Sequence, residues 1–263
     1  MYNYPPNNFL YTSYRIEAIF SNGEEPISPR MATGFVLEIG NGIPFIITNR
    51  HVIELDYKQQ TPKYKDFKLV ELKLTSRRQN DTEYSININP ETEFCFHDNI
   101  ENDVVIIKPL SLPSETNIFH YHFNLEHLAN EEKYKDILPY DLICFTGFPN
   151  THDKLMGRPI LRTGTIASDP NFEYSWDKNS HGNCVAYEGF STEGASGSPI
   201  FAPPRGMLGI PNSRDGYLIG INAGHIPEKY GHSAISYFYK STIIHQIIEK
   251  YKLSELPAVE KAK

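Results

Sequence analysis

Short hydrophobic stretches, separated by clusters of glycine, asparagine and proline, follow one another along almost the whole chain. They are rich in isoleucine, valine, tyrosine and phenylalanine, the side chains that strands favour. The strands predicted in this way cover residues 14–20, 32–40, 44–49, 67–75, 84–88, 103–110, 140–148, 164–168, 183–190, 198–201, 216–224 and 233–239. This succession of short strands predicts an all-β chain built as a sandwich or as barrels.

Helical periodicity is clearest near the C-terminus. Isoleucines recur there on one helical face, at positions 243, 244, 247 and 248, and Ser241 precedes them as a suitable cap. We expect a helix over residues 241–253 whose apolar face packs on a barrel. A weaker pattern predicts a second helix over residues 123–134, in the link between the two halves of the chain. Residues 173–182 and 203–216 are predicted to be loops.

Length and charge narrow the classes of partner. The 263 residues suffice for one large domain or two small barrels. The chain has 25 basic and 32 acidic residues, a net charge of −7, and no stripe of lysine and arginine. We therefore expect no nucleic acid and no anionic membrane among its partners. No apolar run reaches about 18 residues, so no membrane span is predicted.

The N-terminal segment and the cysteines bear on the compartment. The first residues, MYNYPPNNFLYTSYRIEAIF, lack the basic start, the apolar core and the cleavage site of a secretory signal. Cys95, Cys144 and Cys184 are odd in number and far apart, which predicts neither a disulfide framework nor a zinc knuckle. These features predict a cytoplasmic protein.

A candidate nucleophile lies in the stretch STEGASGSPIF, residues 191–201, where small residues surround Ser196. An ordinary turn accounts for such a stretch, because glycine and serine are common in turns. A catalytic serine needs the same setting, with open space on one side and backbone N–H groups turned toward the substrate oxygen. This stretch alone leaves both interpretations open.

A candidate base and a candidate acid precede this serine. His51 follows the strand that ends at Thr48, and a strand end is a rigid mount for a reactive group, although a lone histidine is more often a surface residue. Asp103 directly precedes an apolar strand, and Asp98 is the rival acid. The chain order His, Asp, Ser is that of chymotrypsin, whereas subtilisin and the α/β-hydrolases use other orders.

Several motifs together resemble a known family. The motifs TNRHV, NDVVIIKP, GFP, GASGSPIF and YLIGINAGH resemble those of the chymotrypsin-fold, trypsin-like serine peptidases, and most of all the bacterial glutamyl-endopeptidase type. The resemblance runs from about residue 14 to about residue 252. It implies an all-β fold of two six-stranded antiparallel Greek-key barrels and a C-terminal helix. Residues 1–122 would form the first barrel, and residues 123–263 the linker, the second barrel and the helix.

The resemblance also assigns roles to individual residues. His51 would be the general base, Asp103 would orient it, and Ser196 would attack the substrate. The backbone N–H groups of Gly194 and Ser196 would form the oxyanion hole, and a glycine at position 194 permits the backbone shape that this needs. We expect no metal and no cofactor.

The substrate pocket departs from the pattern of these relatives. Glutamyl endopeptidases carry a histidine where this chain has Asn222, so acidic specificity would require His225 or His232 to take the place of that histidine. Phe190 stands where trypsin-like enzymes carry an acidic pocket floor, which disfavours cleavage after lysine or arginine. The predicted pocket residues are Phe190, Asn222, Ala223, Gly224, His225 and His232.

The sequence thus predicts a serine endopeptidase that cleaves a protein or peptide substrate through an acyl-enzyme. In the cytoplasm, it would need restraint by narrow specificity, by a regulatory protein partner, or by ordering of residues 203–216, and a role in signalling or defence would suit it. The main alternative is a catalytically idle barrel that binds proteins. An esterase with the same triad is a further alternative, as is a metal hydrolase on His120 and His122, which lack a third ligand at helical spacing.

Overall fold

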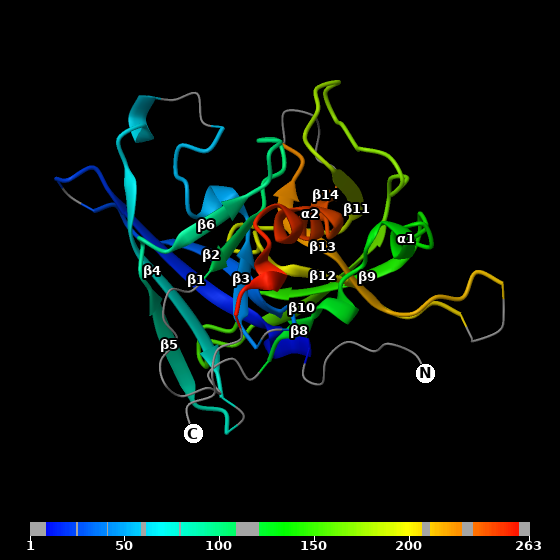
Figure 1. Ribbon diagram of the computed structural model, residues 1–263, viewed down its shortest axis with the longest axis horizontal. Coiled ribbons are helices and arrows are strands. Elements are labelled where there is room, and N and C mark those ends of the chain that lie inside the picture. Colours follow the sequence, from blue (N-terminus) through cyan, green and yellow to red (C-terminus); the bar gives the residue numbers. More distant parts are fainter. Residues whose placement is uncertain are drawn as a thin grey trace.

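The computed structural model describes residues 9–24, 26–40, 42–58, 62–78, 80–108, 121–206, 211–227 and 234–257. Two β-sheets make up most of the fold, with the N-terminal sheet on the left of Figure 1 and the C-terminal barrel on the right. The predicted all-β pair of barrel-like sheets is therefore confirmed. No helix among the described residues is long and apolar enough to cross a membrane.

The N-terminal sheet is a half-barrel rather than a closed barrel of six strands. Its strands run in the order β5-β4-β1-β2-β3-β7-β6, and β8 pairs in parallel with β2. The described strands leave β5 and β6 as the two edges, so the closure that the sequence predicted is not seen there. The bounds are β1 Ser13–Ser21, β2 Arg30–Glu38, β3 Pro44–Thr48, β4 Lys68–Arg77, β5 Glu83–Ile88, β6 Glu93–Phe96, β7 Val105–Lys108 and β8 Phe123–Asn124.

The C-terminal sheet closes into the predicted barrel of six antiparallel strands. Their order around the barrel is β10-β11-β14-β13-β12-β9. Because β11 pairs with β14 and β9 pairs with β12, the chain crosses between strands as in a Greek key. The bounds are β9 Leu142–Gly147, β10 Ile160–Ile166, β11 Cys184–Glu188, β12 Pro199–Ala202, β13 Tyr217–His225 and β14 Ile235–Lys240.

The two predicted helices have different outcomes. The C-terminal helix is present as α2, Thr242–Lys250, and its four isoleucines are buried. The helix predicted over residues 123–134 is wrong: this segment contains β8, a 3₁₀ turn at Leu125–His127 and the single-turn α1, Glu131–Tyr134. Leu128 interrupts any helix because it lies in extended backbone, where it bridges to Leu218 of β13. Other 3₁₀ turns are Phe9–Thr12, Arg50–Val52, Pro62–Tyr64 and Leu253–Glu255.

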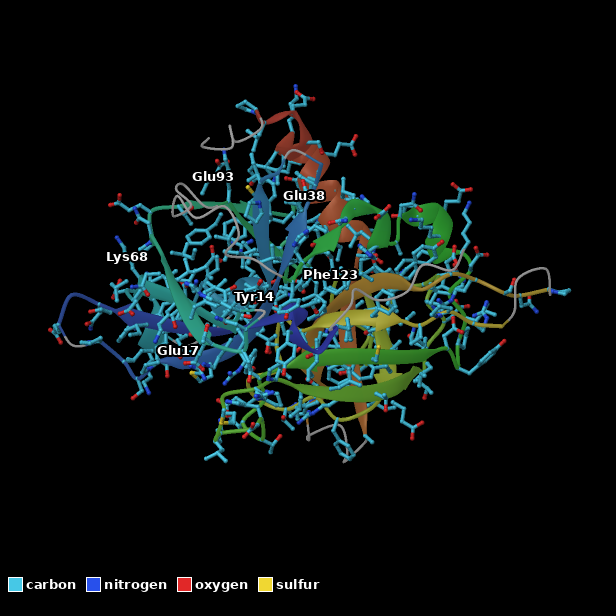
Figure 2. The ribbon with its side chains drawn as sticks, turned by 90° about the horizontal axis from the view of Figure 1, so that it is seen from below. Tyr14, Glu17, Glu38, Lys68, Glu93 and Phe123 are labelled. Atoms are coloured by element: carbon cyan, nitrogen blue, oxygen red, sulfur yellow. The ribbon has the colours of Figure 1, made fainter. Side chains whose placement is uncertain are left out.

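One hydrophobic cluster joins the two sheets. It contains Phe35 of β2, Phe201 of β12 and the isoleucines of α2, all buried. Phe123, which Figure 2 shows near the middle of the molecule, is fully buried in the same cluster. The sheets are therefore docked by a continuous apolar core, and Thr48 at the end of β3 lies close to Gly197 in the turn that precedes β12. The predicted division at residue 122 stays a prediction.

Candidate active site

His51 and Asp103 form a direct pair beside the end of β3 and the start of β7, two neighbouring strands of the N-terminal sheet. β3 ends at Thr48, and His51 lies in the 3₁₀ turn that follows it, while Asp103 precedes β7. The Nδ1 atom of His51 lies 2.5 Å from Oδ2 of Asp103. The backbone N–H of His51 donates to Oδ1 of the same carboxylate at 2.9 Å. Both carboxylate oxygens therefore hold the histidine, which orients the ring.

The environment of this pair controls the charge of His51. The carboxylate is 9% exposed, whereas the imidazole is 38% exposed and remains accessible. Burial lowers the pKa of His51, and the nearby charge of Arg30 lowers it further. The negative charge of Asp103 and the hydrogen bond to it raise this pKa, and their sum prevails, so the pKa of His51 lies above its ordinary value.

The two residues before His51 are also fixed by contacts, and one of them contacts the pair. The buried side chain of Asn49 donates to the backbone carbonyl of Asp103 at 2.8 Å, which ties the end of β3 to the start of β7. The guanidinium of Arg50 lies over the ring of Phe96 and donates to Glu54 at 2.6 Å. Asn49 and Arg50 lie within the motif TNRHV, but nothing in that motif alone indicates these contacts.

The rival acid Asp98 has a different environment. Its side chain is 82% exposed and pairs with Lys250 of α2 at 2.6 Å. The hydrogen bond to Lys250 and the charge of that ammonium lower the pKa of Asp98. Asp98 therefore belongs to a surface ion pair, whereas Asp103 is the carboxylate in contact with His51.

The turn that contains Ser196 leaves two N–H groups open. The N–H groups of Ala195, Gly197 and Ser198 each donate to a backbone carbonyl within the C-terminal barrel and its turns. The N–H groups of Gly194 and Ser196 have no acceptor among the described residues. Two open donors that flank one residue suit the binding of an oxyanion.

Gly194 is required at its position in this turn. Its φ of +90° lies in a region that side chains rarely adopt. A Cβ atom there would also collide with the carbonyl of Phe148. The predicted need for glycine at position 194 thus has two physical reasons, the backbone angle and the close approach of another chain segment.

The two serines of the turn differ in accessibility. Ser196 is half-buried, and its hydroxyl donates to the carbonyl of Ala223 at 3.1 Å. In the described structure Ser196 makes no hydrogen bond with His51. Ser198 is fully buried, and its hydroxyl has no partner among the described residues. Of the two, only Ser196 is open to a substrate.

The side chain of Asn222 is hydrogen-bonded to the serine turn. Its side-chain N–H groups donate to Ser191 Oγ and to the carbonyl of Ala195, both at 2.8 Å, and its Oδ1 accepts from the hydroxyl of Tyr187 at 2.7 Å. Asn222 is fully buried. All its amide groups are occupied by the protein, which leaves no donor for a substrate side chain.

The other predicted pocket residues differ in their exposure. Phe190 is 72% exposed, and His225 at the end of β13 is exposed. Ala223 is buried, and a Cβ atom at Gly224 would meet open space. The guanidinium of Arg162 also reaches this segment and donates to the carbonyl of Phe190 at 2.8 Å. His232 lies outside the described residues.

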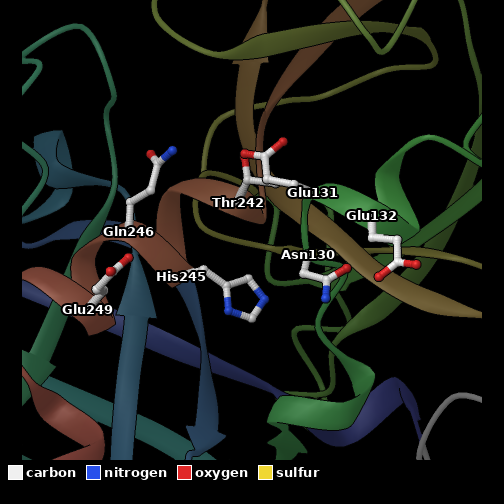
Figure 3. Close-up of a pocket in the computed structure, with 7 residues that line it drawn as sticks. All are labelled: Asn130, Glu131, Glu132, Thr242, His245, Gln246 and Glu249. Atoms are coloured by element: carbon white, nitrogen blue, oxygen red, sulfur yellow. The ribbon is translucent and has the colours of Figure 1, made fainter.

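A separate pocket of about 500 Å³ lies beside α2 (Figure 3). It contains none of the predicted site residues. The pocket is lined by Asn130, Glu131, Glu132, Thr242, His245, Gln246 and Glu249.

A metal site is a separate question. Among the described residues no group of three potential ligands is placed to hold a metal ion. His122 is exposed, and its predicted partner His120 lies outside the described residues.

Comparisons with known proteins bear on the family and the fold of this chain. The trypsin-like peptidase domain family matches residues 32–210. A thermostable serine protease, AL20, from an extremophilic microorganism has a similar structure, with a TM-score of 0.58 and 10% identity over 94% of this chain and 99% of its own. The protease Anisep from Arthrobacter nicotinovorans has a TM-score of 0.57 and 12% identity over 95% of this chain and 97% of its own.

A third similar structure, Deg5, has a TM-score of 0.50 and 16% identity over 91% of this chain and 87% of its own. These likenesses show a chymotrypsin-like fold. No curated protein matches the sequence. The glutamyl-endopeptidase subtype that the motifs suggested is not distinguished by these comparisons, because they identify only the broader group. Since the family match spans well over half of the chain, the protein belongs to the family of trypsin-like peptidases.

Proposed function

We propose that the chain is a serine endopeptidase that uses His51, Asp103 and Ser196 on protein substrates. The observation that carries this proposal is the pair His51–Asp103, in which both carboxylate oxygens hold the histidine. Such a pair fixes the tautomer with the proton on Nδ1 and leaves Nε2 free to accept a proton. The open N–H groups of Gly194 and Ser196 and the family support the same reaction.

The proposed reaction begins with rotation of the Ser196 hydroxyl from the carbonyl of Ala223 toward His51. This moves one side chain between staggered positions, and hydrogen bonds of catalytic groups are often loose before substrate binds. The serine oxygen then bonds to the carbonyl carbon of the substrate while its proton passes to Nε2 of His51. The oxyanion that forms accepts hydrogen bonds from the N–H groups of Gly194 and Ser196.

Collapse of this intermediate breaks the carbon–nitrogen bond. The proton on Nε2 passes to the leaving amine, and an acyl-enzyme on Ser196 remains. Water then gives a proton to His51 and bonds to the acyl carbon. The bond between this carbon and the Ser196 oxygen breaks, the carboxylic acid product leaves, and the proton on His51 returns to Ser196. Asp103 stays ionised throughout and stabilises the imidazolium.

We place this activity inside the cell, on a restricted set of substrates and in signalling or defence. Cys95, Cys144 and Cys184 are free and buried, and burial raises the pKa of each thiol to about 12. Buried free thiols of this kind suit a reducing compartment, which supports the proposed location inside the cell.

Labelling with a fluorophosphonate, together with hydrolysis of a mixed peptide library, tests the proposal. We expect one labelled serine in the wild type, and a loss of about 10⁶-fold in turnover for Ser196→Ala with unchanged folding. Ser198→Ala is the matched control and should keep both labelling and turnover. A folded wild-type protein without labelling or hydrolysis would favour the idle binding barrel, and loss at Ser198 alone would reassign the nucleophile.

A further inference from the structure

Thr33 of β2 reaches from the N-terminal sheet to the serine turn of the other barrel. It is fully buried. Its backbone N–H donates to the carbonyl of Ser196 at 2.8 Å, and its hydroxyl donates to the carbonyl of Gly194 at 2.8 Å. One residue thus holds the carbonyl groups of both residues whose N–H groups are open.

The hydroxyl of Thr33 is itself fixed by a second bond. It accepts from the backbone N–H of Phe148 at 2.9 Å while it donates to Gly194. A buried hydroxyl that both donates and accepts has one preferred rotation, and losing it would leave the N–H of Phe148 and the carbonyl of Gly194 unpaired. The position of the Gly194 carbonyl therefore depends on this side chain.

The same residue connects to the strand that leads to His51. The hydroxyl of Thr48, the last residue of β3, donates to the carbonyl of Thr33 at 2.8 Å. This close approach is possible because residues 197 and 147 are glycines and have no Cβ atom. A Cβ atom at Gly197 would collide with the carbonyl of Thr33, and one at Gly147 would lie too close to the Thr33 hydroxyl. Two glycines thus provide the space in which Thr33 contacts the turn.

We propose that Thr33 is a positioning residue, whose hydroxyl holds the Gly194 carbonyl so that the N–H groups of Gly194 and Ser196 stay directed at the oxyanion. Thr33 does not touch the substrate in this role; it acts through the serine turn. Its bond with Thr48 also fixes the serine turn relative to the segment that bears His51. This inference rests on the proposed function for its effect on catalysis, but not for its effect on the order of the turn.

Three variants test the inference. Thr33→Val removes the hydroxyl and keeps the size of the side chain, and Thr33→Ser restores the hydroxyl. The matched control is Thr146→Val: Thr146 is also fully buried, and its hydroxyl donates to a backbone carbonyl, that of Leu10, at 2.7 Å. All are assayed well below the lowest melting temperature of the set.

We expect Thr33→Val to lower kcat by about 10- to 100-fold, less than the loss of a whole oxyanion donor, with KM within about twofold. Thr33→Ser should recover kcat to within about threefold of the wild type. Thr146→Val should lose a similar amount of thermal stability and keep kcat. Equal kcat values for Thr33→Val and Thr146→Val, or equal losses for Thr33→Val and Thr33→Ser, would overturn the inference.

Amide hydrogen exchange gives a readout that does not need turnover. The N–H of Ala195 is hydrogen-bonded within the turn, to the carbonyl of Thr192 at 3.0 Å. We expect its protection to fall in Thr33→Val and to persist in Thr33→Ser and Thr146→Val. If the wild type is neither labelled nor active, the proposed function fails, and this measurement alone decides whether Thr33 holds the turn. Unchanged protection in Thr33→Val would then overturn the inference.

Discussion

The two halves of the candidate site are held together in different ways. His51 and Asp103 both belong to the N-terminal sheet, and two direct hydrogen bonds join them. The turn around Ser196 belongs to the C-terminal barrel, yet Thr33 of the N-terminal sheet holds two of its carbonyl groups. The acid–base pair therefore depends on one sheet, whereas the nucleophile turn depends on how the two sheets dock.

This difference predicts which changes separate the two halves. A change within the N-terminal sheet at Asp103 should alter the basicity and orientation of His51 and leave the serine turn in place. A change at the docking surface should disturb the serine turn while the pKa of His51 stays the same.

Asp103→Asn should break the acid–base half. Asparagine keeps the shape of the side chain but favours the wrong tautomer of the histidine, which costs about 10⁴-fold in kcat. The matched control is Asp98→Asn, because the Asp98 side chain is 82% exposed and pairs only with Lys250 among the described residues. Surface pairs of this kind contribute little, so we expect less than a twofold change. Steady-state kinetics of both variants check this, and a large loss at Asp98 with none at Asp103 would contradict it.

The pH dependence of wild-type activity should report the N-terminal half alone. Burial lowers the pKa of His51, but the charge of Asp103 and its hydrogen bond raise it to a net value above 6.5. The reaction needs the neutral imidazole, so kcat/KM should rise as pH increases through this raised pKa. Stability has the opposite sign: the contribution of protonated His51 is complete below pH 6.5 and is lost as pH rises through the raised pKa.

Two variants sharpen this pH prediction. In Asp103→Asn the raising influences are lost while burial persists, so the midpoint of the residual activity should move to lower pH. In Thr33→Val the midpoint should stay at the wild-type value even though kcat falls, because Thr33 contacts the serine turn rather than His51. Profiles of kcat/KM between pH 5 and pH 9 check both, and a midpoint shared by the wild type and Asp103→Asn would count against the assigned pair.

The sequence predicts the candidate site residues better than the contacts that hold them. Strand ends, a short apolar strand and a glycine-rich turn are local patterns that suggest His51, Asp103 and Ser196 only weakly one by one, and their order along the chain and the family motifs around them select them together. Thr33 is different, because its hydroxyl meets Gly194 across 161 positions of the chain, and nothing local marks a threonine in an apolar strand for that contact. Asn222 shows the same limit, since its position suggests a pocket residue while its amide is occupied inside the barrel.

The errors in predicting the fold from the sequence have a similar cause. The strand β6 was not predicted because its four residues are too few to show an alternation. The helix predicted over residues 123–134 is wrong because Leu128 extends toward the core between the sheets, where it is 1% exposed. In both places packing between distant segments outweighs the local pattern.

Changes in the substrate pocket, which belongs to the C-terminal half of the site, should alter activity least. Asn222 has no free donor, and Phe190 is largely exposed beside small residues, so we expect cleavage after apolar residues at both pH 5.5 and pH 8. Phe190→Ala should lower kcat/KM for the best substrate by about tenfold, as the loss of apolar contact in a pocket does. A peptide library read by mass spectrometry at the two pH values checks this.

Other outcomes of the library would identify a different pocket residue. A preference for glutamate that weakens as pH rises through about 6.5 would indicate a histidine, with His225 and His232 as the candidates. A preference for glutamate at both pH values would indicate Arg162, whose guanidinium already donates to the carbonyl of Phe190 and has no carboxylate partner among the described residues. Arg162→Gln should then abolish that preference while the pH midpoint of His51 stays in place. Strong cleavage after lysine or arginine would overturn the apolar pocket, because a buried cation needs a carboxylate partner and none of the predicted pocket residues supplies one.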